Sequence, residues 1–268
     1  MDLKDTAKYI NVLGNFCGKR DIDNLSQAEL KCKFGIEKAD IAILFGGSII
    51  AGGDVLAETM QKQLAKKYMI VGGAGHTTQT LRDTIKSLYP DLNIVNDENL
   101  SEAECFARYL KLKYNLAVDL LETKSTNCGN NITFCLDILA KNGIEVKSIL
   151  FIQDSTMQHR MEAGFRKYLA DDVKLINYAS YKAEIVVKEG ELIFAQDILG
   201  MWILNRYISL LMGEIPRLSD DENGYGPKGK DFIATVDIPT EVIDAYNKLK
   251  NDYGNLIRIA NDKYKNPN

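Results

Sequence analysis

Long apolar runs, metal-type cysteine spacings and an excess of basic residues are all missing from this sequence. No apolar run approaches the ~20 residues that span a bilayer, and the opening segment MDLKDTAKYINVL is too charged for a signal peptide. We therefore expect a cytoplasmic protein with no membrane insertion. A net charge of −4 without a basic stripe also argues against nucleic acid as a partner.

Cysteine and histidine are scarce as well. The five cysteines are odd in number and include no C-x-x-C pair, which is typical of reduced thiols and predicts no metal site. Cys128 begins a helix, where a thiolate is stabilised, but the sequence places no base beside it. Of the two histidines, His76 follows a glycine turn and could contact a ligand or only stabilise that turn. We expect His159, in a charged helical segment, to lie on the surface.

Strands and helices alternate through residues 37–183. Apolar runs with the length of buried strands lie at 40–45, 68–71, 92–95, 118–121, 147–153 and 173–178. Because right-handed crossovers return the chain to the same sheet edge, this pattern predicts an α/β fold with a doubly wound, mostly parallel, Rossmann-like sheet.

The flanking segments, residues 1–36 and 184–268, have a different character. Apolar residues recur there mainly at helical spacing, and we expect the two segments to form a smaller, mainly helical second domain. Within them, 184–195 could form a short hairpin or begin a helix. A length of 268 residues allows either one large domain or two unequal ones.

Short polar turns follow the predicted strands at 46–48, 72–78, 125–131 and 153–156. All belong to the carboxyl edge of a parallel sheet, where ligands bind in open α/β folds. Neither glycine-rich turn spells G-x-G-x-x-G, so a standard dinucleotide site is not expected. We expect the turns to line one cleft for a small-molecule ligand.

The segment STNCGNN, from Ser125 to Asn131, joins a strand end to a helix start. Ser125 or Thr126 can cap that helix, while Asn127 and Asn131 place amides beside unpaired backbone N–H groups. This arrangement favours a phosphate or a carboxylate. An Asn-rich helix start followed by ordinary core packing explains the same residues.

The expected ligand-binding residues come from these turns, from neighbouring helix starts and from one later loop. They are Gly46, Gly47, Ser48, Gly73, Gly75, His76, Thr77, Glu102, Ser125, Asn127, Asn131, Gln153, Asp154, Arg160 and Tyr225. Glu102 begins a helix, where a carboxylate is favoured in any case. Arg160 could hold a ligand carboxylate or phosphate, or pair with Glu102 or Asp154. No catalytic residue is assigned.

Two further segments are open to more than one interpretation. The loop at 217–231 is polar and glycine-rich, and it is either a solvated connection or a lid over the cleft. Tyr225, between two glycines, favours the lid. Asp97 and Glu98 follow the predicted strand at 92–95, where nucleotide-binding folds often place a ribose-binding acid.

Several motifs together resemble the YdcF-like branch of the SanA-related bacterial family, a domain of unknown function. They are FGGSIIAGGD (45–54), GGAGHTT (72–78), SEAE (101–104), ETKSTNCGNN (122–131), QDSTMQHR (153–160) and the segment 200–233. The resemblance implies a Rossmann-like domain, a smaller helical domain and a deep cleft that binds S-adenosylmethionine, with no established reaction. Asn130 stands where the family commonly has Glu, and Met157 where it commonly has His, which puts a proton shuttle at either position in doubt.

Three classes of function are compatible with these features. The first is a binding protein or transferase that holds S-adenosylmethionine or a related nucleotide-like ligand. The second is a hydrolase or transferase acting on a phosphorylated or cell-envelope precursor metabolite, with Glu102, His76 and Arg160 in acid, base and charge-stabilising roles. The third is a non-catalytic partner protein, which we disfavour because docking does not need four polar strand ends.

Overall fold

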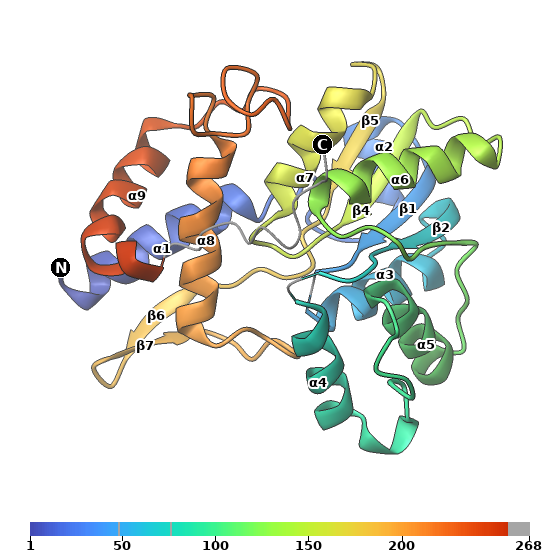
Figure 1. Ribbon diagram of the computed structural model, residues 1–268, viewed down its shortest axis with the longest axis horizontal. Helices are drawn as coiled ribbons and strands as arrows, with labels where there is room; N and C mark the ends of the chain where they lie inside the picture. Colours follow the sequence, from blue (N-terminus) through green and yellow to red (C-terminus); the bar gives the residue numbers. More distant parts are fainter. Residues whose placement is uncertain (48, 76, 257–268) are drawn as a thin grey trace.

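The computed structural model describes residues 1–47, 49–75 and 77–256 (Figure 1). The expected ligand residues Ser48 and His76 lie outside these ranges. Within them, no helix has the length and apolar character needed to cross a bilayer.

A five-stranded parallel sheet forms the centre of the fold and confirms the predicted doubly wound, Rossmann-like class. Its order is β3-β2-β1-β4-β5. The strands are β1 (Ala39–Phe45), β2 (Ala65–Val71), β3 (Leu120–Glu122), β4 (Ser148–Ile152) and β5 (Lys174–Asn177). The strand order reverses between β1 and β4, and this switch point is where open α/β sheets bind ligands.

Helices cover both faces of the sheet because the central strands are apolar on both sides. Successive side chains of β1 alternate, so that Ala42 and Leu44 face one helical layer, whereas Ile41 and Ile43 face the other. The first layer contains α2 (Gln27–Phe34), α3 (Ala51–Gln61), α4 (Thr78–Leu88) and α5 (Glu102–Tyr114). The second contains α6 (Cys128–Lys141) and α7 (Gln158–Tyr168).

The strand predicted at 92–95 is wrong. Pro90–Leu92 forms a short 3-10 helix, η1, and Ile94 and Val95 pack into the core from a loop. Arg108 replaces the missing strand ladder by donating to the carbonyl oxygens of Asn93 and Ile94 at 3.2 and 2.5 Å. The apolar run therefore marks a buried loop, two of whose carbonyl oxygens accept from the Arg108 side chain.

This correction also removes Asp97 and Glu98 from the sheet edge. Asp97 accepts hydrogen bonds from the backbone and side chain of Asn99, while Glu98 forms an exposed ion pair with Lys86. Neither residue follows a strand. The third strand instead runs from Leu120 to Glu122, within two residues of the run predicted at 118–121.

A further helical layer, separate from the two that cover the sheet faces, lies beside the sheet (Figure 1). It contains α1 (Leu3–Cys17), α8 (Leu204–Leu218), α9 (Thr240–Tyr253) and the 3-10 helix η2 (Gly254–Leu256). Residues 184–195 take the hairpin alternative, with β6 (Ile185–Lys188) antiparallel to β7 (Glu191–Phe194). Leu13, Tyr207, Leu211 and Leu249 lie in this layer's own apolar cluster, so elements before and after the sheet share one core.

Candidate functional site

The turns after β1 and β4 meet at the switch point. The Gln153 side chain donates to the carbonyl oxygen of Gly46 at 3.2 Å, and its own backbone N–H donates to Gln158 Oε1 at 2.8 Å. Gln158 in turn donates to Asn177 Oδ1 at 3.1 Å. These amide groups are buried, so the hydrogen bonds fix the relative position of the two strand ends.

The turns after β1, β2 and β3 also converge. A Cβ atom on Gly72 would lie 3.0 Å from the Cα of Gly46, and one on Gly73 would collide with the carbonyl oxygen of Ser125. The Gly73 N–H donates to the Ser125 hydroxyl at 3.1 Å. Glycine is therefore required for the three turns to approach so closely. The structure thus brings together the first, second and third of the predicted polar turns.

Glu102 lies beneath this meeting point. Its Oε1 accepts hydrogen bonds from the hydroxyls of Thr77 and Thr78 at 3.0 and 2.9 Å. The Thr78 hydroxyl accepts one from the Gly75 N–H at 2.7 Å. Burial raises the pKa of the Glu102 carboxyl, although these hydroxyls oppose the shift. The shift favours the protonated form of the carboxyl, which is the form that a general acid uses.

Met157 occupies the space beside Gly47. A Cβ atom on Gly47 would lie 3.3 Å from the Met157 methyl group. Gly47 adopts a φ of 78°, in the left-handed region that favours glycine. The side chain next to this turn is therefore an apolar thioether.

The helix that follows β3 is capped by Asn127. The expected caps, Ser125 and Thr126, are used elsewhere: the Ser125 hydroxyl accepts from Gly73, and Thr126 donates to Asn130 Oδ1 at 3.2 Å. Asn127 Oδ1 accepts from the Asn130 N–H at 3.0 Å. Asparagine is as good an N-cap as serine, and Ser125 is drawn away by its bond to the neighbouring turn. Asn131 is buried.

Arg160 pairs with neither Glu102 nor Asp154, the partners considered from the sequence. Its Nε and Nη2 bind the two carboxylate oxygens of Glu214 in α8 at 2.5 and 3.1 Å. Arg217 Nη1 lies 3.5 Å from the same carboxylate. Burial alone would lower the pKa of Arg160, but the nearby Cys128, Glu214 and Tyr225 raise it well above its ordinary value. Two guanidinium groups therefore share Glu214.

Asp154 is an internal acceptor. Its side chain is fully buried and accepts four hydrogen bonds, from the backbone and hydroxyl of Thr156, from Tyr181 and from Trp202. The distances range from 2.7 to 3.0 Å. Burial raises the pKa of this carboxyl, and the donors oppose the shift. Asp154 thereby fastens the turn after β4 to the segment that leads into α8.

The segment 217–231 is folded on itself. The Tyr225 N–H donates to the Arg217 carbonyl at 3.0 Å, and Asp220 Oδ1 accepts from the Lys228 N–H at 2.8 Å. The Tyr225 ring packs against Phe232, with centroids 5.2 Å apart. These contacts show that the loop is structured. Tyr225 lies near Arg160, whose pKa it raises. Closure of this loop over the cleft stays a prediction.

His159 is not the surface residue expected from its charged surroundings. It packs on the ring of Phe16, with centroids 4.6 Å apart, and its Nδ1 lies 3.0 Å from the Phe16 carbonyl oxygen. A carbonyl only accepts, so Nδ1 carries the proton. Burial lowers the pKa of His159, although the carbonyl opposes the shift. The charges flanking His159 in sequence conceal its role as a contact between α7 and α1.

Two important acidic residues, Glu122 and Glu214, were missed among the site candidates. Glu122 Oε1 accepts from the backbone of Lys124 and Ser125 at 2.6 and 3.0 Å, while its buried Oε2 has no hydrogen-bond partner among the described residues. Glu214 is buried in the apolar stretch LLMGEIP. A charge inside an apolar helix face needs a buried partner, and that signal could have found it.

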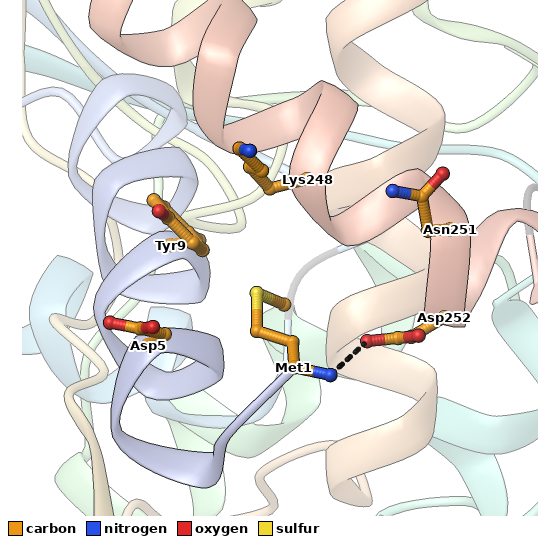
Figure 2. Close-up of a pocket in the computed structure, with 6 residues that line it drawn as sticks. All are labelled: Met1, Asp5, Tyr9, Lys248, Asn251 and Asp252. Carbon is orange, nitrogen blue, oxygen red and sulfur yellow. Dashed lines mark ion pairs between the residues drawn. The ribbon is translucent and has the colours of Figure 1, made fainter.

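A cavity of about 270 Å³ between α1 and α9 belongs to a different part of the molecule (Figure 2). It is lined by Met1, Asp5, Tyr9, Lys248, Asn251 and Asp252. The Met1 ammonium lies 3.6 Å from Asp252 Oδ2. None of the expected ligand residues lines this cavity, so the strand-edge site is separate from it.

No protein-family model matches this chain. Among the described residues, no group of three His, Cys, Asp or Glu side chains is arranged to hold a metal ion.

Proposed function

We propose that this is a cytoplasmic small-molecule-binding protein whose ligand is S-adenosylmethionine or a related nucleotide-like compound. The ligand would lie at the carboxyl ends of β1, β2 and β4. The proposal is supported above all by the close approach of the glycine turns at 46–47 and 72–73, beside the Gly46–Gln153 contact that marks the reversal of strand order between β1 and β4.

The chemistry of this edge suits a ligand with an anionic end. The N–H groups of Gly46, Gly72 and Gly73 already donate within the protein. The attraction for an anion comes instead from the positive end of α6, which lies at the neighbouring corner. Arg160 uses Nε and Nη2 for Glu214, which leaves Nη1 for a carboxylate or phosphate oxygen. Tyr225 lies near that charge, with its ring between Phe232 and the Lys230 ammonium.

The second candidate is a hydrolase or transferase acting on a phosphorylated or cell-envelope precursor metabolite. One observation favours it: Glu102 is a buried carboxyl of raised pKa, held by Thr77 and Thr78 at the same strand edge. A carboxylic acid in such a setting can donate a proton to a leaving group. Turnover of a phosphorylated substrate that Glu102→Gln abolishes would support this candidate over simple binding.

Native mass spectrometry of the freshly purified protein tests the main proposal. We expect a co-purifying adenosyl compound, or, after its removal, binding of S-adenosylmethionine by calorimetry. Arg160→Met combined with Glu214→Leu removes both members of the bidentate pair, and Arg217, which loses its contact with Glu214, still donates to the Gly213 carbonyl oxygen. This double variant should fold and lose at least about tenfold in affinity. Arg166→Met, on the same helix, is the matched control and should bind normally.

Binding that is equally tight in the double variant would contradict the proposed position of the ligand. Absence of binding by adenosyl and nucleotide compounds would contradict the proposed ligand class.

A further inference from the structure

A second polar cavity, of about 180 Å³, lies between the end of α1 and the turn after β4. Its lining residues are Gly14, Asn15, Gly18, Arg20, Ser155, Lys182 and Ala183. Two of them are cations and none is acidic. The turn after β4 contributes to both the cavity and the strand-edge site, but through different residues. Gln153 contacts Gly46 at the strand edge, whereas Ser155 lies beside Gly18 in the cavity.

Arg20 is held in place before any ligand arrives. Its Nε donates to the Ala179 carbonyl oxygen at 2.8 Å, and its guanidinium lies 4.1 Å from the centroid of the Tyr178 ring. No described carboxylate forms an ion pair with it. Burial lowers the pKa of Arg20, and the charges of Tyr178 and Glu58 offset this only in part. An anion in the cavity would supply the missing compensation at little cost in side-chain entropy.

Three further hydrogen-bond donors line the cavity: the Lys182 ammonium, the Asn15 amide and the Ser155 hydroxyl. The Lys182 ammonium and the Asn15 amide are exposed and form no hydrogen bond with other described side chains. Ser155 is buried, and its hydroxyl also forms no hydrogen bond with the described residues. A Cβ atom on Gly18 would collide with this hydroxyl, so glycine at position 18 keeps the space open.

The end of α1 would repel an anion if its carbonyl oxygens were free. Two of the last four are engaged: the Gly14 carbonyl accepts from Gly18 at 2.8 Å, and that of Phe16 accepts from His159 at 3.0 Å. Just beyond the helix, the Lys19 carbonyl accepts from the Ala179 N–H at 3.2 Å. The negative end of the helix is therefore partly satisfied, and the two cations oppose what is left of it.

We infer that this cavity binds a phosphate group, either free phosphate or the phosphoryl end of a phosphomonoester. A guanidinium, an ammonium, an amide and a hydroxyl approach from different residues, which suits a group with several oxygens better than a carboxylate with two. The volume fits a group of this size: a cavity of about 150 Å³ holds a benzene-sized molecule, whereas pockets for whole ligands measure about 300–1,000 Å³.

Calorimetric titration with inorganic phosphate at constant ionic strength tests the inference. Lys182→Gln should raise the Kd for phosphate about three- to tenfold, the range expected for a partly exposed charge. Arg20→Gln should raise it more than about tenfold, because that charge is partly buried. The matched control is Lys188→Gln, a similarly exposed lysine in the adjacent hairpin, which should leave the Kd unchanged.

Glycerol 3-phosphate and acetate form the other two arms. Tighter binding of glycerol 3-phosphate than of phosphate, with the same dependence on Lys182, assigns the site to a phosphomonoester; weaker binding assigns it to free phosphate. Acetate should bind at least about tenfold more weakly than phosphate. Equal Kd values for Lys182→Gln and the wild type, or acetate binding as tightly as phosphate, would overturn the inference. The Arg160→Met/Glu214→Leu variant should bind phosphate normally, and loss of binding there would place the phosphate at the strand edge instead.

Discussion

Arg160 in α7 and Glu214 in α8 form a bidentate ion pair that joins the sheet to the helical layer beside it. Their side chains are only 11% and 4% exposed, so both charges are removed from water. A buried pair of this kind adds little net stability compared with apolar residues of similar volume, but removal of one partner leaves the other as an unpaired buried charge. The ion pair therefore determines the relative orientation of α7 and α8 more than it increases the free energy of unfolding.

We expect Arg160→Met to lower the free energy of unfolding by about 3 kcal/mol, the low end for breaking a buried pair, because Arg217 stays near Glu214. The double variant Arg160→Met/Glu214→Leu should recover most of this loss. Urea denaturation followed by circular dichroism measures both. A single variant as stable as the wild type would mean that water reaches Glu214 freely.

Asp154→Asn should lower the free energy of unfolding by about 1–3 kcal/mol. Asp154 Oδ2 accepts from the Trp202 indole N–H at 2.9 Å, and an amide nitrogen in its place would face that donor. Trp202 is the one tryptophan in the sequence, so its fluorescence reports directly on the contact. A shifted emission maximum in Asp154→Asn, but not in the exposed Asp171→Asn, is the expected result.

Glu102 should make the protein less stable as pH rises. Its folded-state pKa is raised above the ordinary glutamate value of 4.5, so the native state holds the proton more tightly than the unfolded state. The stabilising contribution is complete below that ordinary value and is lost as pH rises through the folded pKa. Glu102→Gln keeps an acceptor for Thr77 and Thr78 but cannot ionise.

Unfolding free energies measured between about pH 4 and about pH 8 should thus fall more steeply for the wild type than for Glu102→Gln. Parallel curves would show that Glu102 titrates alike in the folded and unfolded states. Glu104→Gln is a poor control because its carboxylate completes the capping box of α5. The exposed Glu145→Gln suits better.

Lys113 lies among three tyrosine rings on the side of the sheet away from α6. Its Nζ is 5.0–5.1 Å from the ring centroids of Tyr89, Tyr109 and Tyr114, and 3.1 Å from Asp54 Oδ1. Lys113→Met should lower the free energy of unfolding by about 1–2 kcal/mol. Lys111→Met, on the exposed face of the same helix, should change it by less than about 0.5 kcal/mol. Thermal denaturation of both variants at equal ionic strength compares them, and equal losses would contradict the cation–π account.

The parallel sheet could be predicted because buried strands such as β1 and β4 are continuous apolar runs between glycine or polar turns. The same rule failed at Ile94 and Val95, because Arg108 takes up the carbonyl oxygens of Asn93 and Ile94, and a local pattern cannot reveal this long-range contact. Apolar character reports burial, and it does not report which groups take up the hydrogen bonds.

The convergence of the glycine turns followed from their place after successive strands, whereas the partners of individual side chains did not. Arg160 and Glu214 are 54 residues apart and meet only because α8 packs across α7. The N-cap role of Asn127 could not be predicted either, because Ser125 is an equally good cap by residue type. In the structure the Ser125 hydroxyl accepts from the Gly73 N–H instead. Local chemistry offers several partners for a polar group, and tertiary packing chooses among them.

The arrangement of α1 has a consequence for how the chain folds as it is synthesised. The apolar face of α1 packs against α8, α9 and the β6–β7 hairpin, all of which follow the sheet in sequence. The parallel sheet can assemble on the ribosome once β5 has emerged, but the apolar residues of α1 stay exposed until the hairpin, α8 and α9 have also been synthesised. During that interval α1 is the segment on which a chaperone would act.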